Sequence, residues 1–274
     1  MTTMIEPFHL SAESLMPLAE ANSQRFRTAE PFPHIVFDDF LPEWVVDRVL
    51  EEFPDPGDVP WKEFKQTTSK KLASEGDAFF GDFTRHLLAE HNSATFLQFL
   101  ERLTGIDALV PDPYFFGGGL HQIERGGFLK VHEDFSRHET LRLDRRLNAI
   151  IYLNKDWDPD WGGALEFWDK GMTQAVQSTL PIFNRCVIFS TTPPSNHGHP
   201  EPLACPAERT RRSLALFYYR NDRGEGEHVS VDHDSRYRER PGENLRSGRS
   251  TIKRLTPPII LDASRSLRQR FRRK

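Results

Sequence analysis

The chain has 274 residues, of which 37% are hydrophobic and 28% are charged, and its formal net charge at pH 7 is -4. This composition supports a packed core for one large or two small domains and excludes wholesale disorder. No apolar stretch approaches the roughly 18 residues that span a bilayer, and the slightly acidic balance gives no general reason to expect a nucleic-acid partner.

The N-terminus and the cysteines favour a cytoplasmic protein. Glu6 and Glu13 precede the first basic residue, Arg25, so the segment lacks the basic and apolar regions of a secretory signal. Cys186 and Cys205 are too few for a disulfide framework, and we interpret them as reduced thiols. The sequence does not predict an oligomeric state.

The first part of the chain predicts a supporting layer. Residues 1–30 are mixed and polar, and we interpret them as an extension with a short helix after Ser11 and little function. A strand is predicted at 34–40, and helices are predicted at 42–53 and 83–92 from their apolar stripes. A further helix begins after Ser93 as N-cap and ends at Gly105.

From about Tyr114 the pattern changes to short β-prone runs separated by turns that Gly and Pro mark. The predicted strands are 128–132, 147–153, 164–168, 185–190 and 211–219. Residues 221–254 are polar and predict a surface loop region, and the tail at 264–274 is rich in arginine. The expected fold is an all-β core with flanking helices, of the sandwich or jelly-roll type. We expect one domain, with helical support that includes one or more strands at 1–113, the β core at 114–220, and a polar loop and basic tail at 221–274.

A His-x-Asp pair lies at the end of the first of these runs. The two-residue period of a strand places His132 and Asp134 on the same face, where they can hold one ion together. An imidazole nitrogen and a carboxylate oxygen suit iron(II), manganese or zinc. Two ligands do not complete a site, so a third is needed.

Two histidines compete for the third ligand position. His197 and His199 follow the run 185–190 and have the same parity in an extended segment, so either can face the interior. Two histidines and one carboxylate occupy one face of an octahedral iron and leave positions open for substrate and oxygen.

An arginine on the last core strand suits a carboxylate pocket. Arg211, Ser213 and Ala215 alternate onto one face, so the guanidinium stands above two small residues. Its planar fork binds a carboxylate through two parallel hydrogen bonds. Arg209 and Arg212 are the competing choices in the same segment.

These motifs, taken in order, resemble the 2-oxoglutarate and iron(II)-dependent oxygenases, in particular their prolyl 4-hydroxylase-like branch. The resemblance extends to the runs 148–158 and 162–168, which are similar to a strand, loop and Gly-Gly strand of the hypoxia-factor prolyl hydroxylases. It implies a double-stranded β-helix (jelly roll) at 114–220. The implied iron ligands are His132, Asp134 and His197, where the family spacing to Arg211 favours His197 over His199.

The resemblance also implies a reaction. Arg211 and Tyr152 would bind the far carboxylate of 2-oxoglutarate, with O2 as the second cosubstrate and ascorbate as a supporting reductant. Decarboxylation to succinate and carbon dioxide would accompany hydroxylation of an unactivated C–H bond. Asp134 favours hydroxylation, because halogenating relatives have a small residue at the matching position.

Three functions stay open at this point. The first is hydroxylation of a prolyl or other amino-acid substrate, peptidyl or free, because the motifs resemble prolyl hydroxylases most. The second is oxygenation of an unrelated small metabolite or carbohydrate, since one fold accepts many substrates. The third is a metal-binding or protein-binding module without turnover.

Other polar and aromatic residues have two interpretations each. Gln122 can point towards the cofactor or be a plain strand residue. Trp157, Trp161 and Trp168 can form a substrate rim or pack internally. The polar connection 134–146 can close over substrate or form a surface loop.

Overall fold

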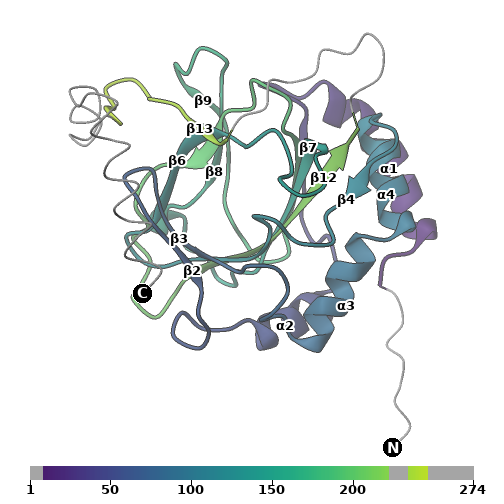
Figure 1. The fold of residues 1–274 in the computed structure, drawn as a ribbon, viewed down its shortest axis with the longest axis horizontal. Coiled ribbons are helices and arrows are strands. Elements are labelled where there is room, and N and C mark those ends of the chain that lie inside the picture. The colour runs from purple at the N-terminus through teal and green to yellow at the C-terminus, as the bar shows by residue number, and fades with distance from the viewer. Residues whose placement is uncertain (1–8, 222–233, 246–274) are drawn as a thin grey trace, which may run out of the picture.

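The computed structural model describes residues 9–221 and 234–245, and within them four α-helices cover one side of a curled antiparallel sheet (Figure 1). The helices are α1 (Ala12–Arg27), α2 (Glu43–Glu52), α3 (Asp82–His91) and α4 (Ala94–Thr104), and a short 3-10 helix covers Pro159–Trp161. The tail at 264–274 and most of the polar loop lie outside the described residues.

The sheet contains thirteen strands in the described part of the chain. The first six are β1 (His34–Phe37), β2 (Lys62–Lys65), β3 (Ser69–Ala73), β4 (Val110–Pro111), β5 (Gly119–Ile123) and β6 (Phe128–Glu133). The others are β7 (Asp144–Tyr152), β8 (Leu165–Trp168), β9 (Ala175–Thr179), β10 (Cys186–Ser190), β11 (His197–His199), β12 (Arg211–Arg220) and β13 (Arg236–Tyr237).

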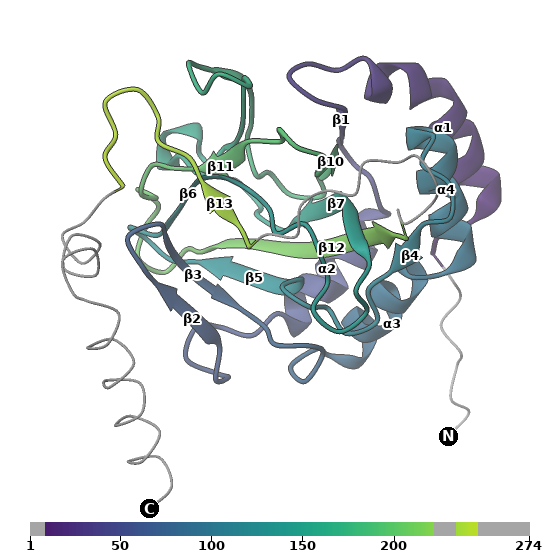
Figure 2. The same cartoon turned by 45° about the horizontal axis from the view of Figure 1, so that its top comes forward.

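The strand order brings distant parts of the chain together. It runs β1-β10-β7-β12-β5-β3-β6-β11-β8-β9, and each of these neighbouring pairs is antiparallel. One end of β3 pairs with β6 and its other end pairs with β5, so β3 joins the two halves where the sheet curls (Figure 2). The result is the expected double-stranded β-helix, open at one end.

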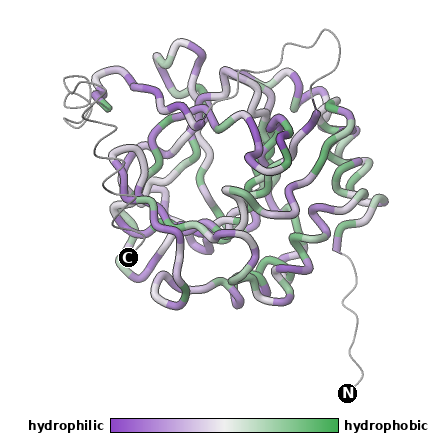
Figure 3. The backbone as a smooth tube through the Cα atoms, in the orientation of Figure 1, coloured by the Kyte–Doolittle hydropathy of each residue, from purple (hydrophilic) through white to green (hydrophobic). Residues whose placement is uncertain are grey.

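Strand alternation divides each central strand between two environments. On β7 and β12, every second side chain packs into one hydrophobic cluster with the helices: Leu147, Ala149, Ile151, Leu214, Leu216 and Tyr218. Hydrophobic stretches follow the helices and strands where these two layers meet (Figure 3). The side chains between them face the interior of the curled sheet.

The expected helices of the supporting layer form where the sequence predicts them. Helix α4 begins after Ser93 and ends at Gly105, whose φ of +77° is the left-handed conformation that glycine adopts most easily. Its buried side chains include Phe96, Phe99 and Leu100, spaced for one helix face. These contacts attach the helical layer to the sheet.

The first part of the chain differs from the expectation in two ways. The helix expected after Ser11 forms as α1, but it has sixteen residues and its Leu15, Ala19 and Phe26 are buried in the shared core, so this segment is not an extension. Besides the strand expected at 34–40, the supporting region contains β2 and β3, which extend the sheet before residue 114 and which the sequence did not predict. In both places, packing against distant residues outweighs weak local signals.

The described part of the predicted surface loop is tied to the sheet. Strand β13 pairs with β6, with Tyr237 opposite His132. Ion pairs join Lys130 to Glu243 (2.6 Å) and Arg238 to Glu133 (2.7 Å). This segment therefore lies beside the strand that carries the His-x-Asp pair. Within the described ranges, no helix combines the length and apolar character needed to cross a membrane.

Candidate metal centre and cosubstrate pocket

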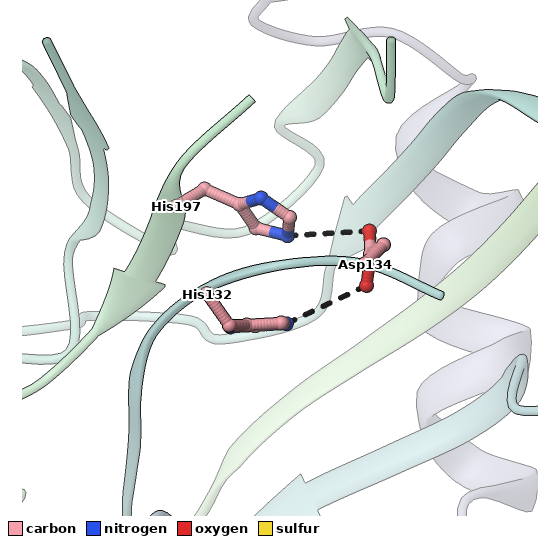
Figure 4. Close-up of side chains that lie close together, drawn as sticks. All are labelled: His132, Asp134 and His197. Atoms are coloured by element: carbon pink, nitrogen blue, oxygen red, sulfur yellow. Dashed lines mark ion pairs between the residues drawn. The ribbon is translucent and has the colours of Figure 1, made fainter. Parts of the chain in front are cut away.

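The structure brings the three expected ligands together. His132 and His197 are directly opposite each other on β6 and β11, and Asp134 follows β6 (Figure 4). Each imidazole Nε2 lies 3.4 Å from a different carboxylate oxygen of Asp134. All three potential donor atoms lie within 4.8 Å of one another, which is close enough to share one ion.

Both histidine rings are oriented by the backbone. His132 Nδ1 lies 2.9 Å from the carbonyl oxygen of Lys130, and His197 Nδ1 lies 2.8 Å from that of Ser195. Because a carbonyl only accepts, each Nδ1 carries the proton and each Nε2 has a free lone pair aimed at the carboxylate. This arrangement is typical of histidines that bind a metal.

The carboxylate of Asp134 is held by residues of β7. Asn148 Nδ2 donates to Asp134 Oδ2 at 2.7 Å, and Arg145 lies 3.2 Å from the same oxygen. Arg145 also donates to Asn148 Oδ1 at 2.9 and 2.6 Å, which fixes the amide. Burial opposes ionisation of Asp134, but nearby positive charge, that of Arg145 above all, outweighs it and holds the pKa of the carboxyl well below its usual range.

The imidazole of His197 is neutral at physiological pH. Burial lowers the pKa of His197 to about 4, although Asp134 opposes this shift. A neutral imidazole is the form that binds a metal.

His197 lies at the carboxylate, whereas His199 lines the same cavity farther along β11. Gly198 between them permits the close approach of β11 to β6, since a Cβ there would lie 2.8 Å from the carbonyl oxygen of Leu129. Of the two competing histidines, the structure thus places His197 in the triad.

Arg211 and Tyr152 meet at the other side of the cavity. Arg211 is only 5% exposed, and its guanidinium donates to the Tyr152 hydroxyl at 3.2 Å and to the carbonyl of Gly163 at 2.8 Å. Gly163 has a φ of +75°, and a Cβ there would lie 3.1 Å from Arg211 Cδ and closer still to Leu203. The Gly-Gly strand therefore leaves room for the arginine to enter.

The phenol of Tyr152 is a hydrogen-bond donor at physiological pH. Burial raises the pKa of Tyr152, and Arg211 only partly opposes this effect. A protonated hydroxyl and a guanidinium beside each other suit one carboxylate.

One cavity of about 490 Å³ connects these groups. This volume is typical of sites for small molecules. Its polar lining includes the triad, Arg211 and Tyr152, and its aromatic lining includes Phe64, Tyr114, Phe116, Phe135, Phe217 and Tyr237. The cavity thus offers a charged interior and an aromatic wall.

The other candidates from the sequence lie elsewhere. Gln122 donates to the carbonyl of Pro54 and accepts from Thr210, and it does not line the cavity. Trp157 and Trp161 pack in a separate hydrophobic cluster. Trp168 Nε1 donates to Glu166.

The two competing arginines point away from the cavity. Arg209 donates to the carbonyl of Lys155, and Arg212 pairs with Asp55 at 2.5 Å. The alternation of β12 therefore directs Arg211 alone of these three into the pocket.

Sequence reasoning missed four residues of the site. Arg145 and Asn148 support Asp134, Lys71 enters the cavity from β3, and the Tyr237 ring lies 5.3 Å from that of His132. Alternation along β7 could have placed Asn148, since it has the same parity as Tyr152. The contacts of Lys71 and Tyr237 depend on strand pairings with no local signal.

The donor set fits iron(II). Two imidazole nitrogens and one carboxylate are the facial ligands of non-haem iron enzymes, and such a site leaves the remaining positions open. Each ring is already oriented by a backbone carbonyl, and the carboxylate is held by Asn148 and Arg145. The residues present would therefore hold the ion with side chains that are already oriented.

Fold and site together define a jelly-roll protein with a candidate metal centre of two histidines and one carboxylate. Residues 118–241 match the 2OG-Fe(II) oxygenase superfamily. The chain therefore contains a 2OG-Fe(II) oxygenase domain, whose cofactor and cosubstrate are iron(II) and 2-oxoglutarate. This confirms the resemblance seen in the sequence.

The most similar proteins found include prolyl hydroxylases. The chain is 35% identical over 86 residues to the mouse prolyl 3-hydroxylase OGFOD1, a match that covers 30% of this chain and 15% of that protein. Its fold is similar to that of a Trichoplax adhaerens prolyl hydroxylase in complex with a hypoxia inducible factor peptide fragment, with a TM-score of 0.52, 17% identity, and coverage of 76% of this chain and 91% of that one.

A Phytophthora capsici prolyl 4-hydroxylase has the same fold. Its TM-score is also 0.52, at 17% identity, and the match covers 80% of this chain and 69% of that one. At such identities, these likenesses show the fold.

Proposed function

We propose that this protein is a 2-oxoglutarate- and iron(II)-dependent dioxygenase that hydroxylates an unactivated C–H bond on a prolyl or other amino-acid substrate. The observation that carries the proposal is the convergence of His132, Asp134 and His197 with Arg211 and Tyr152 in one cavity. In this reaction, 2-oxoglutarate is decarboxylated to succinate and carbon dioxide while one oxygen atom enters the substrate.

The residues of the chain divide the work between the two ends of the cavity. Bound iron supplies the oxidation chemistry. His132, Asp134 and His197 would hold the ion, with the tautomer of each ring fixed by its backbone partner. Arg211 and Tyr152 would bind the far carboxylate of 2-oxoglutarate and so orient the cosubstrate in the cavity.

The aromatic wall supports an amino-acid substrate with a ring. Tyr114 is 56% exposed, although it lines the cavity, and Phe116 and Phe135 pack edge to face beside it, with ring centroids 5.5 Å apart. Such surfaces accept an apolar ring while leaving the metal-facing end of the cavity polar. The prolyl hydroxylases among the similar proteins support the same substrate class.

We also propose that the chain acts as one oxygenase domain in the cytoplasm. The helices and the sheet share one hydrophobic cluster, which supports a single folding unit. Both cysteines are buried and unpaired, which suits a reducing compartment.

The test is a turnover assay with a mixed substrate pool. Purified protein, iron(II), 2-oxoglutarate, oxygen and ascorbate are incubated with prolyl peptides, free amino acids, other small metabolites and carbohydrates, and products are screened by mass spectrometry for a gain of one oxygen. We expect succinate formation that depends on iron(II), with the gain on a prolyl or other amino-acid substrate. If only another metabolite or a carbohydrate gains an oxygen atom, the proposed amino-acid substrate class is wrong and that compound class takes its place. Iron binding without succinate formation would favour a module without turnover.

A further inference from the structure

Lys71 occupies the place where the two halves of the sheet join. Its neighbour Lys70 pairs with Phe128 of β6, the strand of His132, while Leu72 pairs with Gln122 of β5. Strand β5 in turn pairs with β12, the strand of Arg211. Strand β3 therefore lies between the strand of His132 and the strand beside Arg211, and the Lys71 side chain lines the cavity that the metal ligands and Arg211 also line.

Lys71 differs from Arg145 and Lys62, two other cations of the cavity, in having no anionic partner among the described residues. Arg145 is paired with Asp134, and Lys62 is paired with Glu75 at 2.6 Å. Among the described residues, Lys71 makes no hydrogen bond or ion pair, and its ammonium lies 5.1 Å from the centroid of the Phe64 ring. Burial, with Arg145 and Arg211, lowers the pKa of Lys71 to about 8 despite the attraction of Asp134.

His199 is a second uncommitted group in the same cavity. It is only 3% exposed, and neither ring nitrogen has a hydrogen-bond partner within the described part of the chain. An imidazole carries at least one N–H donor in either protonation state, so His199 has a donor without an acceptor among the described residues. A buried polar ring without a partner is costly, so a ligand that accepts this N–H would stabilise it.

The charges of the cavity favour an anion beside these two groups. Among the described lining residues, the carboxylate of Glu75 is paired with Lys62 and that of Asp134 is paired with Arg145. The positive charges of Lys71 and Arg211 then have no carboxylate in this described lining to balance them. A divalent metal and the 2-oxoglutarate dianion cancel each other, so loading the site leaves the positive excess in place.

We propose that Lys71 and His199 form a second carboxylate-binding subsite, between the metal ligands and Arg211. This inference rests on the proposed function, because it assumes that Arg211 and Tyr152 take the far carboxylate of 2-oxoglutarate. The carboxylate at the second subsite belongs either to the metal-proximal end of 2-oxoglutarate or to the primary substrate. Lysine binds it as a point charge, and the imidazole N–H gives it direction.

The first arm of the test compares two probes that differ in one carboxylate. Levulinate has a methyl group where 2-oxoglutarate has its metal-proximal carboxylate, so only 2-oxoglutarate can use the second subsite through that group. Binding of each is measured by calorimetry on metal-free and zinc-loaded protein, for the wild type, Lys71→Met, His199→Leu and Lys70→Met. Lys70 is the matched control, since it is exposed and next to Lys71 on β3.

If the cosubstrate fills the subsite, Lys71→Met weakens 2-oxoglutarate about tenfold or more and changes levulinate by less than about twofold. His199→Leu then acts in the same direction with a smaller effect, and Lys70→Met matches the wild type. Equal weakening of both probes by Lys71→Met would overturn the proposal, because the lysine would then serve the carboxylate at Arg211.

The second arm tests the primary substrate. Two proline-containing peptides that differ only in an aspartate or an asparagine beside the proline are titrated into the protein with and without zinc and 2-oxoglutarate. A wild-type preference for aspartate that Lys71→Met loses and Lys70→Met keeps would place the substrate carboxylate in the subsite.

The two arms separate the subsite from the proposed function. If the wild type binds 2-oxoglutarate but Lys71→Met matches Lys70→Met with every probe, the subsite is wrong and the proposed function stands. If the wild type does not bind 2-oxoglutarate, the proposed function is wrong. The subsite is then supported only if the wild type prefers the aspartate peptide and Lys71→Met loses that preference, and it is wrong otherwise.

Discussion

The two faces of β7 and β12 differ in what they contribute. The face towards the helices is apolar, and Leu147, Leu214 and Leu216 are almost completely buried there. The face towards the cavity carries Tyr152 and Arg211, which are equally buried but polar. The same strands therefore stabilise the fold on one side and form the site on the other.

The difference lies in how burial is compensated. Apolar side chains gain free energy simply from leaving water. Buried polar groups lose hydration and need partners, as Asn148 finds in Asp134 and Arg211 finds in Gly163 and Tyr152. We therefore expect substitutions on the helix face to lower stability, and substitutions on the cavity face to change metal or cosubstrate binding.

The largest effect is expected at the metal. His197→Ala should abolish iron-dependent succinate formation, because it removes one of three ligands, whereas His199→Ala should leave appreciable activity at saturating 2-oxoglutarate. Metal content of the two variants, measured after reconstitution with iron(II) in the absence of oxygen, accompanies the assay. The reverse result would assign the ligand role to His199.

On the opposite face, a cavity-forming substitution should lower stability. Leu216 is 2% exposed in the cluster shared with the helices, so Leu216→Ala should reduce the free energy of unfolding by about 2–5 kcal/mol. Ser213→Ala, three positions earlier on the cavity face of β12, should change it by less than about 1 kcal/mol. Urea unfolding of both variants measures this, and equal losses would contradict the division between faces.

The same division explains what the sequence could predict. The pairs His132/Asp134 and Arg211/Ser213 are spaced by two residues within strongly β-prone runs, so alternation alone puts each pair on one face. Helix α4 was equally predictable, because Ser93, Gly105 and its apolar stripe agree.

The residues that the sequence did not predict owe their positions to contacts between distant segments of the chain. Lys71 enters the cavity because β3 bridges β5 and β6, and nothing in the lysine-rich sequence of this strand indicates this. Phe26 reaches the core because α1 packs against α4, although half of the residues of α1 are polar. Such contacts are tertiary, and local patterns do not contain them.

A buried histidine of the helical layer should make the stability of the protein fall at acid pH. Burial lowers the pKa of His91 on α3 from 6.5 to about 4, so the unfolded chain binds this proton first. The contribution of neutral His91 to the free energy of unfolding is therefore complete above pH 6.5. It is lost as the pH falls towards 4, at about 1.4 kcal/mol per pH unit. The free energy of unfolding of metal-free protein, measured with urea and plotted against pH across this range, should have a smaller slope for His91→Phe than for the wild type. The difference should correspond to one proton. Identical slopes would contradict the shift.

On the cavity face, Arg211 should control the affinity for 2-oxoglutarate. Arg211→Ala removes charge-assisted hydrogen bonds worth about 1.5–3 kcal/mol each, so affinity should fall at least about tenfold. Arg211→Lys restores the charge without the fork and should lose less. Arg209→Ala and Arg212→Ala are the controls, since both side chains point away from the cavity. If either control loses affinity while Arg211→Ala keeps it, the assignment of the carboxylate site is wrong.

The smallest effect is expected for Tyr152→Phe, which removes one neutral donor and keeps the ring. The Tyr152 hydroxyl lies 3.2 Å from the Arg211 guanidinium, and both would share one carboxylate of 2-oxoglutarate. A single hydrogen bond to a charged group contributes about 1.5–3 kcal/mol, whereas Arg211 supplies a pair of such bonds together with its charge, so the affinity should fall by about tenfold or somewhat more, and less than in Arg211→Ala. Calorimetric titration of zinc-loaded protein with 2-oxoglutarate measures the change, and zinc binding itself should be unaltered because the triad is intact. A loss as large as that of Arg211→Ala would instead mean that the hydroxyl is needed to hold the guanidinium in place.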